Sequence, residues 1–147
     1  MPLVFQPPFI TMLMVVTAWL MHAFLGPWDT VLRMPRIGTL LMLLGSGFML
    51  WARVLFTSRK TTLFVGQSST QLVCGGPFRV SRNPMYVGVL VSLVGLALCV
   101  GMLPLYLTVP SVFVVFNFFH IPREEVMLRE VFTERYRTYT KEVRRWL

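Results

Sequence analysis

The sequence has few charged residues, and acidic ones are almost absent from its first 122 positions. Charged residues make up 14% of the 147-residue chain, whereas a soluble domain carries about 25%. Five of the six acidic residues follow residue 122, and the sixth is Asp29. Because 55% of the residues are hydrophobic, this composition excludes an ordinary soluble domain and indicates a membrane protein.

Cysteine is also scarce, and the pattern of the two cysteines excludes several classes of site. Cys74 and Cys99 form neither a C-x-x-C pair nor a zinc-ligand spacing, so we expect no disulfide framework and no metal site. The first apolar segment has no Lys or Arg before it and no A-x-A-like cleavage site. We interpret it as a retained membrane segment and not as a signal peptide.

Long apolar runs are what the sequence does contain. Residues 85–121 include no Asp, Glu, Lys or Arg, and this run is about twice the length of one bilayer crossing. Gly101 and Pro104 interrupt it near its middle, which is typical of a tight turn. The sequence therefore predicts one all-α integral membrane domain over residues 1–147 with about four transmembrane helices, the last two a tight hairpin, at residues 9–25, 37–56, 85–100 and 104–119.

Small residues form a stripe along the third predicted span. Gly88, Ser92, Gly95 and Cys99 are spaced four, three and four residues apart, so they share one face of a helix. Small side chains let helix backbones approach closely in lipid. We interpret this stripe, and the Gly-Ser-Gly at residues 45–47, as helix packing and not as a nucleotide site.

The basic residues indicate the orientation of the chain. The segments 57–84 and 122–147 are both rich in Arg and Lys, and two spans separate them. The positive-inside rule therefore places both segments, and both termini, in the cytoplasm. Anionic lipid headgroups explain the net charge of +8 better than nucleic acid does.

The last segment predicts an amphipathic cytoplasmic helix over residues 122–145. Apolar side chains recur at helical spacing on one face, at Leu128, Phe132, Tyr136, Tyr139, Val143 and Trp146. Pro122 suits the first turn of a helix, and Glu124 and Glu125 suit its positive N-terminal end. An anchor that lies on the membrane surface would explain the stripe, but it leaves the paired glutamates unexplained.

The predicted hairpin brings two polar corners to the cytoplasmic rim. Asn83 and Pro84 have the residue types of an N-cap and a first helical position, and Arg79 and Arg82 precede them. His120, Glu124 and Glu125 emerge on the same side. A ligand with a carboxylate, a positive centre and hydroxyl groups, such as S-adenosylmethionine, would fit between these corners, although simple helix capping and lipid contact explain the same residues.

Two motifs resemble a known family. "GPFRVSRNPMYVG" at residues 76–88 and "IPREEVMLREVFTERYRTYTKEVRRWL" at residues 121–147 are similar to the isoprenylcysteine carboxyl methyltransferase family of membrane enzymes. The matching positions are Gly76, Arg82, Pro84, Tyr86, Gly88, Glu124, Glu125, Phe132, Tyr136 and Tyr139. The resemblance covers roughly residues 70–147. Phosphatidylethanolamine N-methyltransferase is similar in the same places.

The resemblance implies an S-adenosylmethionine site at the cytoplasmic face of a bacterial or archaeal inner membrane. Its cofactor-binding residues would be Gln71, Leu72, Val73, Phe78, Arg82, Asn83, Pro84, Tyr86 and Glu125. Phe78 stands where the family often has Tyr, and Asn83 stands where it usually has His. Glu124 and His120 would act at the methyl acceptor. Because the eukaryotic enzymes place an Arg at the position of His120, this departure weakens the case for a prenylcysteine-type carboxylate acceptor.

The chemistry implied is in-line displacement at a methyl carbon, for which the protein positions the partners and excludes water. A carboxylate acceptor needs no base, whereas an amine or thiol must lose a proton, which His120 or Glu124 would take. The acceptor would be lipidic, or small and apolar. A phospholipid amine and a thiol remain alternatives, as does a non-catalytic membrane subunit that binds lipid.

Overall fold

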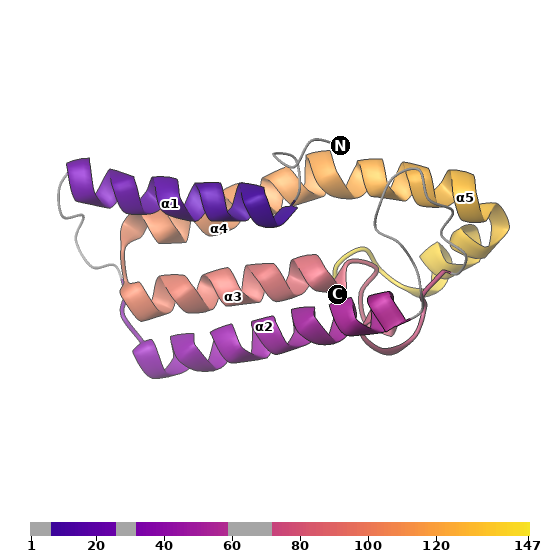
Figure 1. The fold of residues 1–147 in the computed structure, drawn as a ribbon, viewed down its shortest axis with the longest axis horizontal. Coiled ribbons are helices and arrows are strands. Elements are labelled where there is room, and N and C mark those ends of the chain that lie inside the picture. Colours follow the sequence, from indigo (N-terminus) through magenta and orange to yellow (C-terminus); the bar gives the residue numbers. More distant parts are fainter. Residues whose placement is uncertain (1–6, 26–31, 59–71) are drawn as a thin grey trace.

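The computed structural model describes residues 7–25, 32–58 and 72–147, and every regular element in these ranges is a helix. Figure 1 shows α1 lying beside α4 and α2 lying beside α3, with the four helices roughly aligned. The elements are α1 (Pro7–Leu25), α2 (Pro35–Ser58), the 3₁₀ turn η2 (Gly76–Arg79), α3 (Pro84–Val100), α4 (Leu103–Val115), the π-helical turn η3 (Phe116–His120) and α5 (Ile121–Glu142).

The all-helical fold class is confirmed. The first three predicted spans lie within two residues of α1, α2 and α3, and the fourth, 104–119, covers α4 and most of η3. α2 and the helix that starts at Leu103 are long and apolar enough to cross a membrane, and α1 and α3 are shorter apolar helices. Large apolar side chains point outward from the first two helices; Trp19 is 62% exposed and Leu43 is 68% exposed. A broad apolar surface of this kind suits contact with lipid.

Glycines bring α2 and α3 into close contact. A Cβ atom at Gly45 would lie 2.7 Å from the carbonyl oxygen of Gly88, and one at Gly38 would lie 2.5 Å from that of Gly95. Ser46 and Ser92 add a hydroxyl contact of 3.2 Å between the two helices. The predicted packing role of the small-residue stripe is thus confirmed, and α3 is held in a fixed position against α2.

The turn between α3 and α4 forms at the predicted glycine. Gly101 has a φ of 82°, in the left-handed region that favours glycine. Its N–H donates to the carbonyl oxygen of Ala97 at 2.7 Å, which ends α3. α4 begins two residues later at Leu103, so the two helices form the tight hairpin that the sequence predicts.

A helix, α5, begins at Ile121, one residue before the predicted start at Pro122, but it has no free N-terminus because η3 leads directly into it. α4 continues through η3 directly into α5, so that the helical run from Leu103 passes Pro122 without a break and continues to the kink at Thr133. Proline lacks an N–H and crowds the preceding turn, and the π turn lengthens the hydrogen-bond spacing just before Pro122. Glu124 and Glu125 therefore do not lie at a free helix N-terminus.

α5 is not one straight helix that lies on a membrane. Thr133 has φ 32° and ψ −101°, and this kink turns the second half of α5 back toward the start of α3 (Figure 1). Tyr136, Tyr139 and Val143 are buried and pack together with Leu128 and Phe132. The apolar stripe thus packs against its own chain, because the kink folds its two ends together, and the interpretation as a surface anchor is wrong.

Candidate functional site

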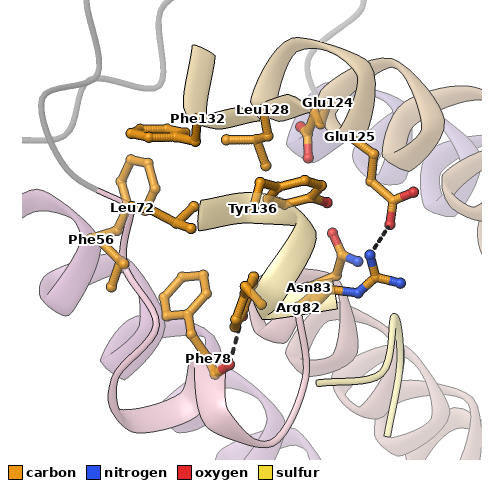
Figure 2. Close-up of a pocket in the computed structure, with 12 residues that line it drawn as sticks. Phe56, Leu72, Phe78, Arg82, Asn83, Glu124, Glu125, Leu128, Phe132 and Tyr136 are labelled. Carbon is orange, nitrogen blue, oxygen red and sulfur yellow. Dashed lines mark hydrogen bonds and ion pairs between the residues drawn. The ribbon is translucent and has the colours of Figure 1, made fainter. Parts of the chain in front are cut away.

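A cavity of about 60 Å³ lies between the end of α2, the segment before α3, and the two halves of α5. Figure 2 shows the side chains that surround it. Its lining residues are Phe56, Leu72, Val73, Phe78, Arg82, Asn83, Glu124, Glu125, Leu128, Phe132, Tyr136 and Tyr139. The kink at Thr133 is what brings the last two of these to the others, because it reverses the direction of α5.

The lining divides into an apolar side and a charged side. The rings of Phe56, Phe78 and Phe132 gather on one side in Figure 2, and Arg82 and Glu125 lie on the other. The hydroxyl of Tyr139 donates to the carbonyl oxygen of Phe78 at 2.6 Å, which fixes the wall between α5 and η2. An aromatic wall that faces charged groups suits a ligand with a flat ring system and a charged end.

Glu125 is the buried centre of a cluster of arginines. Its side chain is 5% exposed, and Arg82 Nη1 lies 3.1 Å from its Oε1. Arg145 binds both carboxylate oxygens, with Nε at 3.2 Å from Oε1 and Nη2 at 2.7 Å from Oε2. Arg129 lies 3.7 Å from Oε2. Three guanidinium groups therefore surround one carboxylate, and the cluster has an excess of positive charge.

The cluster leaves one donor of Arg82 unused. The Nε of Arg82 is buried and has no hydrogen-bond partner among the residues that the structure describes. An unsatisfied buried donor is costly, and within a cavity it indicates a place for an acceptor atom of a ligand. Arg82 can thus bind an anionic group while it stays paired with Glu125.

Asn83 immediately precedes α3, but its side chain does not cap the helix. Its Nδ2 instead donates to the carbonyl oxygen of Arg145 at 3.0 Å, and its backbone N–H donates to Ser81 Oγ at 3.0 Å. The position of Asn83 was therefore predicted, whereas the predicted capping bond is absent. The amide is used to hold the C-terminal segment beside the cavity.

Glu124 has surroundings quite different from those of Glu125. It is half-buried, and its Oε1 accepts a hydrogen bond of 2.7 Å from the hydroxyl of Tyr86. Tyr86 is buried and packs on Phe116, with ring centroids 4.6 Å apart. Burial raises the pKa of the Glu124 carboxyl, and the hydrogen bond from Tyr86 lowers it again. The pKa of the Glu124 carboxyl therefore lies above its ordinary value, which suits a group that takes and releases a proton.

His120 lies outside the set of residues that line the cavity. It belongs to η3, where its ring lies edge-on to that of Phe116, with ring centroids 6.0 Å apart. Burial, and then the nearby charge of Arg123, lower the pKa of His120. The structure therefore does not bring His120 to the cavity with Glu124, and its predicted role as a base remains a prediction.

The other predicted residues fall into three groups. Those that line the cavity are Leu72, Val73, Phe78, Arg82, Asn83, Glu124 and Glu125. Tyr86 does not line the cavity but bonds to Glu124, which does, and Pro84 is buried as the first residue of α3. Gln71 lies outside the described residues.

Several lining residues were not predicted as part of the site, namely Phe56, Leu128, Phe132, Tyr136 and Tyr139. The last four belong to the apolar stripe of α5. The sequence predicts this stripe, but it does not predict that the stripe packs against the site. Arg145 was missed as well, because nothing distinguishes it from the other arginines of the tail until the chain is folded.

A model of the phospholipid methyltransferase family matches residues 34–135. The chain belongs to the phospholipid methyltransferase family. The match runs from the start of α2 into the second half of α5, so it includes Arg82, Tyr86, Glu124 and Glu125. The resemblance drawn from the sequence is confirmed at the level of this family, whose members are methyltransferases that act on lipids. No curated protein and no solved structure matched the chain.

Proposed function

We propose that this phospholipid methyltransferase family member transfers a methyl group from S-adenosylmethionine to a lipidic or small apolar acceptor at the cytoplasmic face of the membrane. The observation that carries the proposal is the cavity between the end of α2, the segment before α3 and α5. It joins an aromatic wall, an arginine with an unused donor, and a half-buried carboxylate at the end of apolar helices.

The residues fit the chemical groups of S-adenosylmethionine. Phe56, Phe78 and Phe132 offer faces for an adenine ring, and the free Nε of Arg82 suits a carboxylate. A volume of about 60 Å³ is only about two water molecules in size, so an adenosyl group requires the walls to separate. Leu72 and Val73 belong to no helix, and they can move without breaking helical hydrogen bonds.

S-adenosylmethionine supplies a methyl group that is already activated by the positive sulfur. The chain's own residues bind and orient the two reactants and exclude water from between them. The apolar wall formed by Leu128 and Phe132 keeps the cavity dry next to Glu124. Glu124 accepts the proton that an amine acceptor loses, and Tyr86 holds its Oε1 in place.

The charge of Glu124 favours an amine acceptor over a carboxylate. A half-buried carboxylate repels a second carboxylate and attracts an ammonium group. A phospholipid headgroup amine meets this requirement and agrees with the family to which the chain belongs. A prenylcysteine-type carboxylate, as in isoprenylcysteine carboxyl methyltransferases, and a thiol are the competing acceptors.

The proposal is tested with the full chain purified in detergent and returned to lipid vesicles. Labelled S-adenosylmethionine binding is measured first, and methyl transfer is then measured with phosphatidylethanolamine, an isoprenylcysteine and an apolar thiol offered separately. We expect binding and transfer to the amine. Transfer only to the carboxylate or thiol would overturn the choice of acceptor. Failure to bind the cofactor would favour a lipid-binding subunit without catalysis.

A further inference from the structure

The last five residues of the chain, Val143–Leu147, form a strap that crosses the start of α3. The backbone N–H of Arg82 donates to the carbonyl oxygen of Arg144 at 2.9 Å. The carbonyl oxygen of Arg145 accepts from Ser81 Oγ at 3.1 Å and from Asn83 Nδ2 at 3.0 Å. Residues 81–83 are thus tied to the strap by three hydrogen bonds.

The end of the strap is anchored on the π turn and on α4. The indole Nε1 of Trp146 donates to Asn117 Oδ1 at 3.0 Å. Its ring packs on Phe113, with centroids 4.9 Å apart. The anchor holds the backbone on either side of Arg145, so the guanidinium of Arg145 reaches Glu125 from a fixed direction.

We propose that Arg145 is a positioning residue of the cofactor site, which keeps Glu125 occupied so that Arg82 retains a donor for the ligand's carboxylate. The inference rests on the proposed function, because it names the group that the strap holds ready for S-adenosylmethionine.

The geometry explains why Arg82 has a free donor. Arginine and a carboxylate pair best through two parallel hydrogen bonds, yet Arg82 meets Glu125 through Nη1 alone. Arg145 already makes the two-bond contact with Glu125. Without Arg145, Glu125 would turn both oxygens to Arg82 and use the Nε donor that now has no partner. The net charge of the cluster would also fall by one.

A merely structural strap would act differently from a positioning residue. Loss of general packing would weaken the binding of any adenosine-containing ligand. Loss of the free donor on Arg82 would weaken only ligands that carry the amino acid carboxylate. S-adenosylhomocysteine has this carboxylate, and 5′-methylthioadenosine lacks it but retains the adenosine and the sulfur, so the pair separates the two roles.

The test compares the binding of these two nucleosides by wild-type chain and Arg145→Gln in detergent. We expect Arg145→Gln to weaken S-adenosylhomocysteine binding by about tenfold or more, the usual effect of one charge-assisted hydrogen bond, and to leave methylthioadenosine binding unchanged. Arg82→Gln should have the same selective effect, and the double variant should be no worse than either. Arg145→Lys keeps a cation without the planar fork, so its affinity for S-adenosylhomocysteine should lie between those of wild type and Arg145→Gln.

Arg137→Gln is the matched control, because Arg137 also pairs with a glutamate but both partners are largely exposed. It should leave both affinities unchanged. If Arg145→Gln weakens the binding of both nucleosides equally, or of neither, the positioning role is overturned. If Arg145→Gln does not fold, Arg145→Lys carries the same comparison.

A second measurement separates failure of this inference from failure of the proposed function. If wild-type chain binds neither nucleoside, the proposed function is wrong. Removal of C-terminal residues by a carboxypeptidase, followed by mass spectrometry, then tests the strap without a ligand. We expect faster removal from Arg145→Gln than from wild type or Arg137→Gln. Equal rates in all three would overturn the part of the proposal that makes Arg145 hold the strap against Glu125.

Discussion

Replacing Tyr86 by Phe should shift the pH dependence of methyl transfer toward higher pH. The change removes only the hydroxyl that donates to Glu124 Oε1 at 2.7 Å. The ring stays in place against Phe116, since its packing there does not need the hydroxyl. Glu124 then keeps the burial that raises its pKa and loses the hydrogen bond that lowers it.

The size of the shift follows from the strength of this bond. A hydrogen bond to a charged group is worth about 1.5–3 kcal/mol, and one pKa unit corresponds to about 1.36 kcal/mol. The pKa of Glu124 should therefore rise by about one to two units in Tyr86→Phe. A base must be deprotonated to act, so the rate falls as pH drops through this pKa, and the acid limb should move upward by the same amount.

The assay measures kcat/KM for the lipid amine as a function of pH, because this quantity reports the essential groups of the enzyme before the acceptor binds. Tyr106→Phe is the matched control. Its hydroxyl also makes a short bond, 2.6 Å to the carbonyl oxygen of Leu32, but no carboxylate is involved. Its profile should coincide with that of wild type.

An acid limb that stays in place in Tyr86→Phe would refute the assignment of Glu124 as the base. A limb that stays in Tyr86→Phe but disappears in His120→Gln would assign the proton transfer to His120 instead. A wild-type rate that is flat across the acid range, with chemistry rate-limiting, would mean that the acceptor needs no base. The carboxylate acceptor would then replace the amine.

Four further perturbations test other parts of the site and fold. Glu124→Ala should abolish turnover and leave S-adenosylmethionine binding nearly intact, as measured by labelled-cofactor retention. Gly45→Leu should lower the thermal midpoint, because its Cβ would lie 2.7 Å from the backbone of α3, whereas Gly47→Leu meets nothing within 4 Å and should not. Thr133→Gly should raise the midpoint by relieving a positive φ that costs about 1–3 kcal/mol. A reporter fused after Leu147 should be active only in the cytoplasm, and activity on the outer side would refute the orientation.

The helices could be predicted from the sequence because their causes are local. Uninterrupted apolar runs predict the spans, and the glycine at residue 101 predicts the hairpin turn. The sequence also predicts which face of α3 packs against another helix, since Gly88 and Gly95 recur at helical spacing and lie against α2. Each of these inferences needs only the periodicity of a helix and the preferences of single residues.

The shape of α5 could not be predicted, because its causes are not local. Thr133 is an ordinary residue for a helix surface, yet it adopts a positive φ that only surrounding contacts can maintain. Pro122 predicts a free helix start, whereas the π turn before it lets the helix continue through Pro122. The approach of Tyr136 and Tyr139 to the rest of the cavity wall, and the contact of Arg145 with Glu125, follow the kink at Thr133, so sequence reasoning could not predict them.

The two neighbouring glutamates illustrate how one motif yields two chemical roles. Successive residues of a helix point about 100° apart, so Glu124 and Glu125 face different surroundings even though their sequence context is the same. Glu125 points into three guanidinium groups and serves to arrange charge. Glu124 points to a buried hydroxyl, in surroundings that raise its pKa. Carboxylates whose environments differ in this way commonly divide binding and proton transfer between them. The paired glutamates therefore need no free helix end to explain them. In the function we propose, Glu125 would arrange the arginines that meet the cofactor's carboxylate, and Glu124 would take the acceptor's proton.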